Sequence, residues 1–153
     1  MALPNQGDID QQSITGATAT GTHGTGASLQ NLSSRVVGAR IALASGEIVE
    51  CSPTQNAKLW QASRLHLGAF GLVVAVQLQC VESYRLQEQI QKLPLSEALN
   101  DLDTLVANNR HCEFFWYSQS DTANLKTINP TDTPAEYPLA GEGERCGWSY
   151  EVL

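Results

Sequence analysis

The most informative stretch of this 153-residue chain is residues 16–26, which read GATATGTHGTG. Glycines let the backbone come close to a ligand and adopt positive φ angles that other residues avoid. Successive backbone N–H groups in such a segment can form a concave anion site, and the threonine hydroxyls between the glycines add donors. The stretch therefore predicts either a ligand-binding loop or a purely structural turn.

A diphosphate, or the polar edge of a flavin ring, would suit such a loop. The segment contains no lysine, so it is not a P-loop of the GxxxxGK[ST] type. It does not follow a hydrophobic strand or match GxGxxG, which disfavours a Rossmann nucleotide site.

The best-patterned core follows this stretch. Residues 35–44 and 47–51 are apolar-rich runs separated by Ser45-Gly46, and they predict a β-hairpin. Residues 55–63 predict a short helix. Residues 72–80 predict a strand that is buried on both faces at first and alternates later.

The pattern changes after residue 82. Residues 84–91 alternate like an exposed strand, and 113–117 predict a compact aromatic strand. The aromatic run 114–117 is expected to pack in a core, with the floor of a substrate pocket as the alternative. Residues 119–153 contain three prolines and predict mostly loop. Strands alternating with helices favour an α+β fold. Between the two strands, apolar residues at three- and four-residue spacing predict one amphipathic helix with Pro94 near its start: Leu95, Leu99, Leu102, Leu105 and Val106.

Composition excludes several classes of function. The net charge of -7 disfavours unaided binding to nucleic acid or to an anionic membrane. No signal peptide opens the chain, and the longest apolar run, residues 67–76, is short of the ~20 residues of a spanning helix. We therefore expect a cytoplasmic protein. The cysteines are too widely spaced for a CxxC metal site and predict reduced thiols: Cys51, Cys80, Cys112 and Cys146.

Four segments, in order, resemble one enzyme family. Residues 7–16, GDIDQQSITG, with 20–26, TGTHGTG, resemble the second flavin-contacting segment of the aldonolactone oxidases. These are flavoproteins of the vanillyl-alcohol-oxidase (PCMH) type and include gulonolactone, galactonolactone and D-arabinono-1,4-lactone oxidases. Residues 64–76 are similar to the family's Gly-x-x-Gly-hydrophobic strand, and 112–117 and 147–152 to parts of its substrate domain.

The resemblance implies an internal fragment of a flavoenzyme. Residues 1–82 would be the C-terminal part of a PCMH-type FAD-binding domain, and 83–153 the truncated start of an α+β substrate (cap) domain. The implied cofactor is FAD. The match places six loop residues around it and two strand residues against it through their backbone: Ser13, Thr18, Gly21, Thr22, His23 and Gly24, with Val73 and Val74.

The remaining ionisable residues favour structural roles. His23 is expected to donate a hydrogen bond or to pack, and the histidine that links flavin covalently in some family members would lie in an earlier segment. His66 is expected to be a core or surface histidine, and His111 to end the helix of residues 95–110, where its charge suits the helix C-terminus. Asp8 and Asp10 suggest a solvated turn or helix cap, with acid–base catalysis or a cation site as the alternative.

The implied activity is oxidation of a sugar 1,4-lactone by hydride transfer to flavin, with electrons passed to oxygen or another acceptor. Catalytic residues and the first flavin segment are expected outside this chain, so the fragment should be inactive alone. Three alternatives stay open: a related alditol oxidase, a non-catalytic phosphate- or ligand-binding module, and membrane-peripheral association of the whole protein. No metal site is expected.

Overall fold

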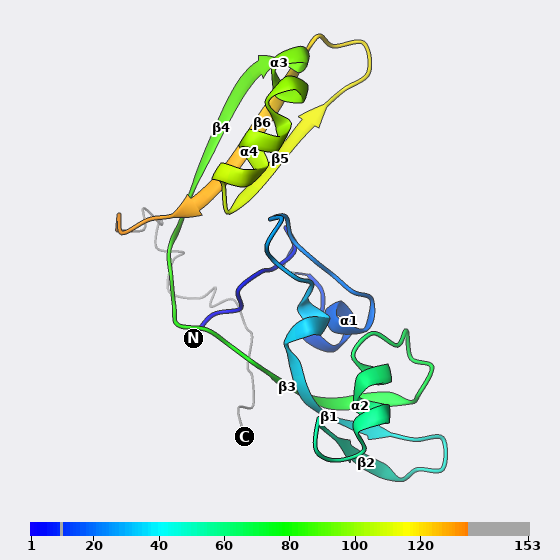
Figure 1. Ribbon diagram of the computed structural model, residues 1–153. Helices are drawn as coiled ribbons and strands as arrows, with labels where there is room; N and C mark the ends of the chain where they lie inside the picture. Colours follow the sequence, from blue (N-terminus) through cyan, green and yellow to red (C-terminus); the bar gives the residue numbers. More distant parts are fainter. Residues whose placement is uncertain (10, 135–153) are drawn as a thin grey trace, which may run out of the picture.

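The computed structural model describes residues 1–9 and 11–134, which form two three-stranded antiparallel sheets carrying short helices. The fold is α+β, as predicted. Figure 1 shows the two sheets apart from each other, joined by an extended linker at residues 79–85. Asp10, Cys146 and the predicted family segment 147–152 lie outside the described residues.

The first sheet is built on the predicted hairpin. Its strands are β1 (Val36–Ala42), β2 (Ile48–Cys51) and β3 (Leu72–Leu78), in the order β2-β1-β3. At the turn, the Leu43 N–H donates to the Glu47 carbonyl at 2.8 Å. Gly46 there has φ 86°, which glycine adopts without steric penalty. The hairpin prediction is confirmed.

Helix α2 (Ala57–Ser63) packs on this sheet and confirms the predicted helical segment. The indole Nε1 of Trp60 donates to the Val36 carbonyl at 3.2 Å, which attaches the helix to β1. The Arg64 guanidinium lies 4.7 Å from the Trp60 ring centroid.

The first 34 residues are more regular than predicted. They contain α1 (Ile14–Ala19) and begin the 3-10 helix η1 (Leu32–Arg35). Ser13 accepts from the Gly16 N–H at 3.2 Å and Asn31 from the Ser34 N–H at 3.1 Å, so each helix begins at a side-chain cap. The prediction of a loop or turn at residues 16–26 overlooked the first of these caps and is wrong for residues 16–19, which are helical.

Strand β3 is more exposed than predicted. Leu72 is 71% exposed and Val74 47%, so burial on both faces at the start of the strand is wrong. Strand β3 is the end strand of its sheet. Ala42 on β1 pairs with Leu72 on one side and with the exposed Ile48 on the other, so the three form an apolar row across the sheet.

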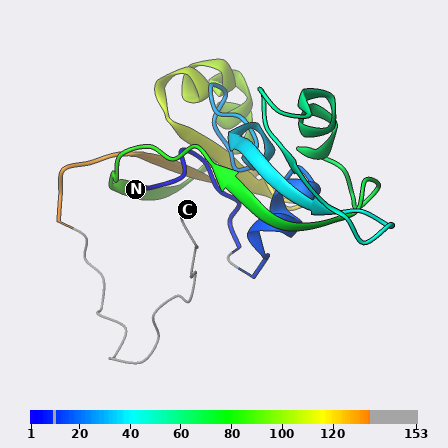
Figure 2. The ribbon, with the colours of Figure 1, turned by 90° about the horizontal axis from the view of Figure 1, so that it is seen from below.

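The second sheet has helices on one face. Its strands are β4 (Leu86–Pro94), β6 (Thr122–Pro130) and β5 (His111–Trp116), in the order β4-β6-β5. Helices α3 (Leu95–Asn100) and α4 (Leu102–Asn108) lie on one side of it, as Figure 2 shows from below. The core between the layers contains Leu93, Ala98, Ala123 and Leu125.

Several expectations for this half are corrected, among them core packing of the aromatic strand: Phe115, Trp116 and Tyr117 are 48%, 47% and 73% exposed. Strand β6 occupies a region predicted as loop, because Ala123 and Leu125 alternate with polar residues and fill the core. The single predicted helix is two helices divided at Asp101. His111 does not end a helix: it is the first residue of β5 and is buried.

The first residues run beside the linker. Ala2 pairs with Val81 in an antiparallel bridge, and the Tyr84 hydroxyl donates to the Leu3 carbonyl at 2.7 Å. The start of the chain thereby fastens the linker between the sheets. Within the described ranges, no helix combines the length and apolar character needed to cross a membrane.

Candidate functional site

The segment predicted to contact flavin, residues 13–26 and called the flavin loop below, is a short helix followed by a tail that folds back on the start of the chain. The tail begins at Gly21, with φ 73°. The Thr22 hydroxyl donates to Gln12 Oε1 at 3.1 Å. A Cβ at Gly24 would lie 2.1 Å from the Gln6 carbonyl oxygen. Gly24 therefore permits close contact with the chain itself.

The threonines of α1 use their hydroxyls internally. Thr18 is 4% exposed, and its hydroxyl donates to the Ile14 and Thr15 carbonyls at 3.0 and 3.1 Å. Thr20 donates to the Gly16 carbonyl at 2.9 Å. These two side chains stabilise the helix, so the expectation that interleaved threonine hydroxyls all serve as ligand donors does not hold.

Ser13 and His23 are exposed along the loop. His23 Nδ1 lies 3.0 Å from the Gly24 carbonyl oxygen. In the neutral imidazole this contact places the proton on Nδ1 and leaves Nε2 as an acceptor. A hydrogen-bonding role, as predicted, matches this geometry.

Val73 and Val74 lie on β3, opposite β1. The register runs from Ala75 opposite Arg40 to Val73 opposite Ile41, so Val74 is the extra residue of a β-bulge. A bulged residue is left out of the ladder, so its backbone groups can meet another partner.

The charge of this region fits an anionic cofactor. No aspartate or glutamate occurs between residues 11 and 46, although the whole chain has a net charge of -7. The segment carries Arg35 and Arg40. Its exposed side chains include Ser13 and His23, which are hydrogen-bonding groups and not carboxylates. These residues can lie along a diphosphate and a flavin edge without carboxylate repulsion.

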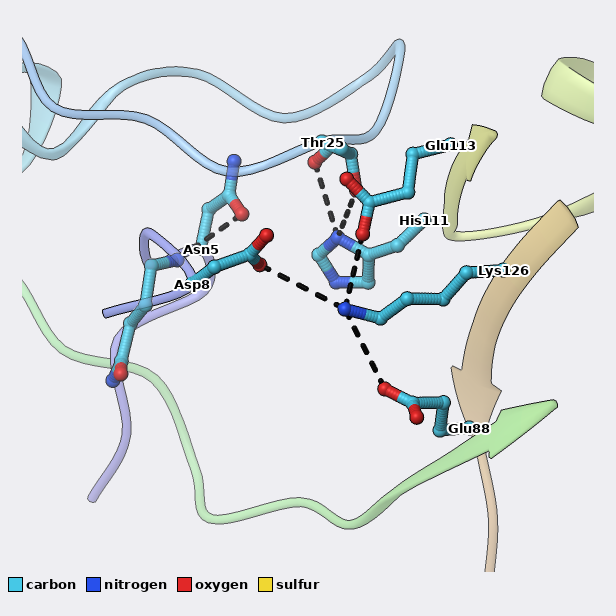
Figure 3. A network of polar contacts seen from close by, with 8 residues as sticks. Asn5, Asp8, Thr25, Glu88, His111, Glu113 and Lys126 are labelled. Carbon is cyan, nitrogen blue, oxygen red and sulfur yellow. Dashed lines mark hydrogen bonds and ion pairs between the residues drawn. The ribbon is translucent and has the colours of Figure 1, made fainter. Parts of the chain in front are cut away.

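A second cluster surrounds Lys126 (Figure 3), which alternates with the core residues Ala123 and Leu125 along β6 and so lies on the opposite face of the sheet. Lys126 Nζ lies 3.0 Å from Glu113 Oε1, 3.5 Å from Glu88 Oε2 and 4.0 Å from Asp8 Oδ1. Lys126 pairs directly with Glu113 across β6 and β5. The hydrogen bond to Glu113 is the main cause that raises the pKa of Lys126. We call these four residues the lysine cluster.

His111 forms the adjoining contact with the flavin loop. Its Nδ1 lies 3.1 Å from the Thr25 carbonyl oxygen and 3.3 Å from Thr25 Oγ1. The residue is 7% exposed, and burial lowers its pKa, partly opposed by the Thr25 hydrogen bond. The neutral ring therefore donates from Nδ1 to the end of the loop.

Arg110 adds further contacts between the second sheet and the first residues of the chain. Its Nη2 donates to the Pro4 carbonyl at 2.6 Å, and its guanidinium lies 4.9 Å from the Tyr84 ring centroid. A Cβ at Gly26 would come within 2.5 Å of the Arg110 carbonyl oxygen. The end of the flavin loop and the start of β5 are therefore in close contact.

The structure separates the residues predicted for FAD into two places. Six lie along the flavin loop and two on β3; these assignments stay predictions. Sequence reasoning missed Lys126, Glu113 and Arg110, and it placed His111 on a helix. The alternation of the apolar Ala123 and Leu125 with the polar Asn124 and Lys126 was the signal that could have identified β6.

Comparisons with known proteins match both halves of the chain. Residues 1–52 match a family model described as FAD binding domain, and residues 76–151 match one described as D-arabinono-1,4-lactone oxidase. These findings indicate FAD as the cofactor, as predicted.

The similar curated proteins bear the names of lactone-oxidising enzymes. An L-gulono-1,4-lactone dehydrogenase of Mycobacterium tuberculosis is 42% identical over 96% of this chain and 35% of its own length. An L-gulonolactone oxidase of Scyliorhinus torazame is 36% identical over 88% of this chain and 30% of its own length. This chain thus spans about a third of the length of the curated relatives it matches.

A solved structure shares the fold. Cholesterol oxidase from Brevibacterium sterolicum superposes with a TM-score of 0.70 at 19% identity, over 80% of this chain and 26% of that one. The order of the two family matches and the shared fold agree with the resemblance seen in the sequence. The chain belongs to the aldonolactone oxidase family of FAD-binding proteins.

Proposed function

We propose that the protein containing this chain is an FAD-dependent oxidoreductase that oxidises a CH–OH group of a sugar 1,4-lactone. The observation that carries the proposal is the contact between the flavin loop and the second sheet at Thr25 and His111. It joins a segment that matches an FAD-binding model to one that matches a lactone-oxidase model. Relatives named for gulonolactone and arabinonolactone support a lactone in preference to an alditol.

Bound FAD would accept the hydride, and the protein would orient cofactor and substrate. In this chain, Ser13 and His23 would donate or accept hydrogen bonds along the cofactor. Gly21, Thr22 and Gly24 would contribute mainly backbone, because their surroundings pack on the chain itself. Thr18 would support them from beneath, as a buried side chain.

Two strand residues would meet another part of the cofactor. Val73 and Val74 would contact it through their backbone, and the bulge at Val74 supports this role. No catalytic residue is assigned within the described part of the chain. The two sheets would hold flavin and substrate in a fixed relative position.

The electron acceptor and the location are part of the same proposal. Relatives are named both dehydrogenase and oxidase, which supports oxygen or another oxidant as the acceptor. The free thiols of Cys51, Cys80 and Cys112 support a reducing, cytoplasmic setting.

Flavin retention tests the proposal. We would purify this chain and a longer polypeptide extended at both ends, and record absorption between about 350 and 500 nm, where a bound flavin absorbs. We expect the longer protein to be yellow and to lose its absorption anaerobically when a sugar 1,4-lactone is added. Loss of absorption with an alditol but not with a lactone would identify the alditol alternative. A colourless longer protein that binds no added FAD would overturn the flavoenzyme assignment.

A further inference from the structure

We propose that Lys126 and His111 are positioning residues for the flavin loop: from the second sheet, Lys126 holds the segment that precedes the loop, and His111 holds Thr25 near its end. Neither residue belongs to the loop or to the family segments that suggested flavin contacts. The inference deepens the proposed function and rests on it for the identity of the loop's ligand.

The two contacts stand on either side of the loop along the chain. Lys126 reaches Asp8, which precedes the loop, at 4.0 Å. His111 reaches Thr25, near the loop's end, at 3.1 Å. Figure 3 shows Lys126 and His111 on neighbouring strands of one sheet, with Asp8 and Thr25 approaching from the other half of the chain. One rigid surface therefore contacts the segments that enter and leave the loop.

Lys126 determines whether Asp8 is attracted to the second sheet or repelled by it. Glu113 and Glu88 hold its ammonium group at 3.0 and 3.5 Å, and the side chain is 17% exposed, so its position is fixed before Asp8 is considered. Without the ammonium, Asp8 would face two carboxylates and the contact would become repulsive. Lys126 thus changes the sign of the charge interaction between Asp8 and the second sheet.

His111 supplies a directional contact. It is buried and donates to a backbone carbonyl, so it fixes where the chain leaves the loop. The close approach of Gly26 to the Arg110 carbonyl restrains the same point. A ligand that orders the loop should therefore strengthen both contacts. By thermodynamic linkage, each contact should in turn increase the affinity for that ligand, and the two effects are equal in free energy.

Hydrogen exchange of the 153-residue chain tests the inference without flavin. The reporters are the Thr22 N–H, bonded to the Ala17 carbonyl at 2.9 Å, and the Leu29 N–H, bonded to the Gly26 carbonyl at 3.0 Å. We expect Lys126→Met to speed exchange at Thr22 by roughly fivefold or more, and Lys126→Arg to restore it. His111→Ala should speed exchange at Leu29, while His111→Asn, which keeps a donor, should not.

Two controls separate positioning from general stability. Lys92→Met removes an exposed lysine on β4 of the same sheet and should leave both reporters unchanged. Asp8→Asn combined with Lys126→Met should partly reverse the faster exchange of Lys126→Met alone, because it removes the carboxylate that Glu113 and Glu88 would repel. Unchanged reporters in Lys126→Met, or equally faster exchange throughout β5 and β6, would overturn the inference.

A second measurement connects the inference to the cofactor. In the longer polypeptide, Lys126→Met should weaken FAD binding by roughly fivefold or more, measured by flavin fluorescence, and Lys126→Arg should restore it. If no protein binds FAD, the proposed function fails, and the exchange data still decide whether Lys126 and His111 hold the loop. If FAD binds equally well to all variants, positioning of the cofactor fails while the function stands.

Discussion

The glycines of the flavin loop differ in how much space a side chain would have, although their sequence surroundings are alike. Gly24 is restricted by the Gln6 carbonyl, whereas Gly16, inside α1, would place a Cβ 3.1 Å from the flexible Ser13 hydroxyl. Sequence reasoning predicted that these glycines approach a ligand. The structure shows that Gly24 approaches its own chain, and a one-dimensional pattern cannot distinguish these two neighbours.

Substitution of the two glycines tests this difference. Gly24→Ala should lower the free energy of unfolding by about 1–3 kcal/mol, because the methyl group overlaps a backbone carbonyl. Gly16→Ala should change it by less than about 1 kcal/mol, since alanine favours the helix. Urea denaturation of both variants measures the effect. Equal stability of the two variants would contradict the close-contact argument.

His111 makes stability depend on pH. Burial lowers its pKa in the folded state, so below about pH 6.5 the unfolded chain binds more protons than the folded one. The free energy of unfolding should therefore fall as the pH falls from about 6.5. The slope should be smaller than about 1.4 kcal/mol per pH unit, which is the value for uptake of one whole proton. Arg110 also lowers this pKa, whereas Glu113 and Asp8 raise it.

The matched variant for this measurement is His111→Asn, which keeps a donor near Thr25 and cannot titrate. Urea denaturation at a series of pH values should show a smaller slope for this variant between about pH 5 and 6.5. An identical slope in both proteins would mean that another group dominates the dependence.

At the scale of elements, the sequence predicted those whose signals are local. The β1–β2 hairpin has a Ser-Gly turn, and α2 lies where the helical segment was expected. Strand β6 was missed because nearby prolines favoured a loop, and its place in the middle of a sheet depends on partners far away in sequence. Exposure of β3 was also beyond local reasoning, since it depends on which surfaces cover the strand.

The core of the second sheet depends on β6. Leu125 is 2% exposed and packs with Leu93, Ala98 and Ala123. Leu125→Ala should lower the free energy of unfolding by about 2–5 kcal/mol, because it leaves a cavity. Leu86→Ala, at a half-exposed position on β4, should have an effect of about 0.5 kcal/mol or less. Thermal unfolding followed by circular dichroism compares them, and equal losses would contradict the assigned core.

For the whole molecule, the resemblance predicted the family and the cofactor, but not how the two halves meet. Local sequence patterns predicted a loop at Lys126 and a helix end at His111. Neither residue could therefore be predicted to contact the flavin loop. The contacts of Arg110 with Pro4 and Tyr84 likewise link residues that are far apart in sequence. Such a junction depends on tertiary packing and has no periodicity to reveal it.

Arg110 should protect the linker. Arg110→Gln removes the Tyr84 contact, and we expect chymotrypsin to cleave near Tyr84 roughly threefold faster or more. Arg85→Gln is the control, since Arg85 is exposed and its backbone carbonyl still accepts from Thr131. Mass spectrometry of the early fragments gives the rates. Unchanged cleavage in Arg110→Gln would show that other contacts fasten the linker.

The middle position of β6 also has a consequence for the order of folding. Strands β4 and β5 both pair with β6, and the first residue of β4, Leu86, pairs with the last residue of β6, Pro130. During synthesis, the earlier two strands and their helices therefore emerge before the second sheet can close. Such a late, non-local pairing slows folding and leaves apolar strand surface open to other chains in the meantime. A ribosome-bound chain that ends before residue 122 would present this surface to chaperones.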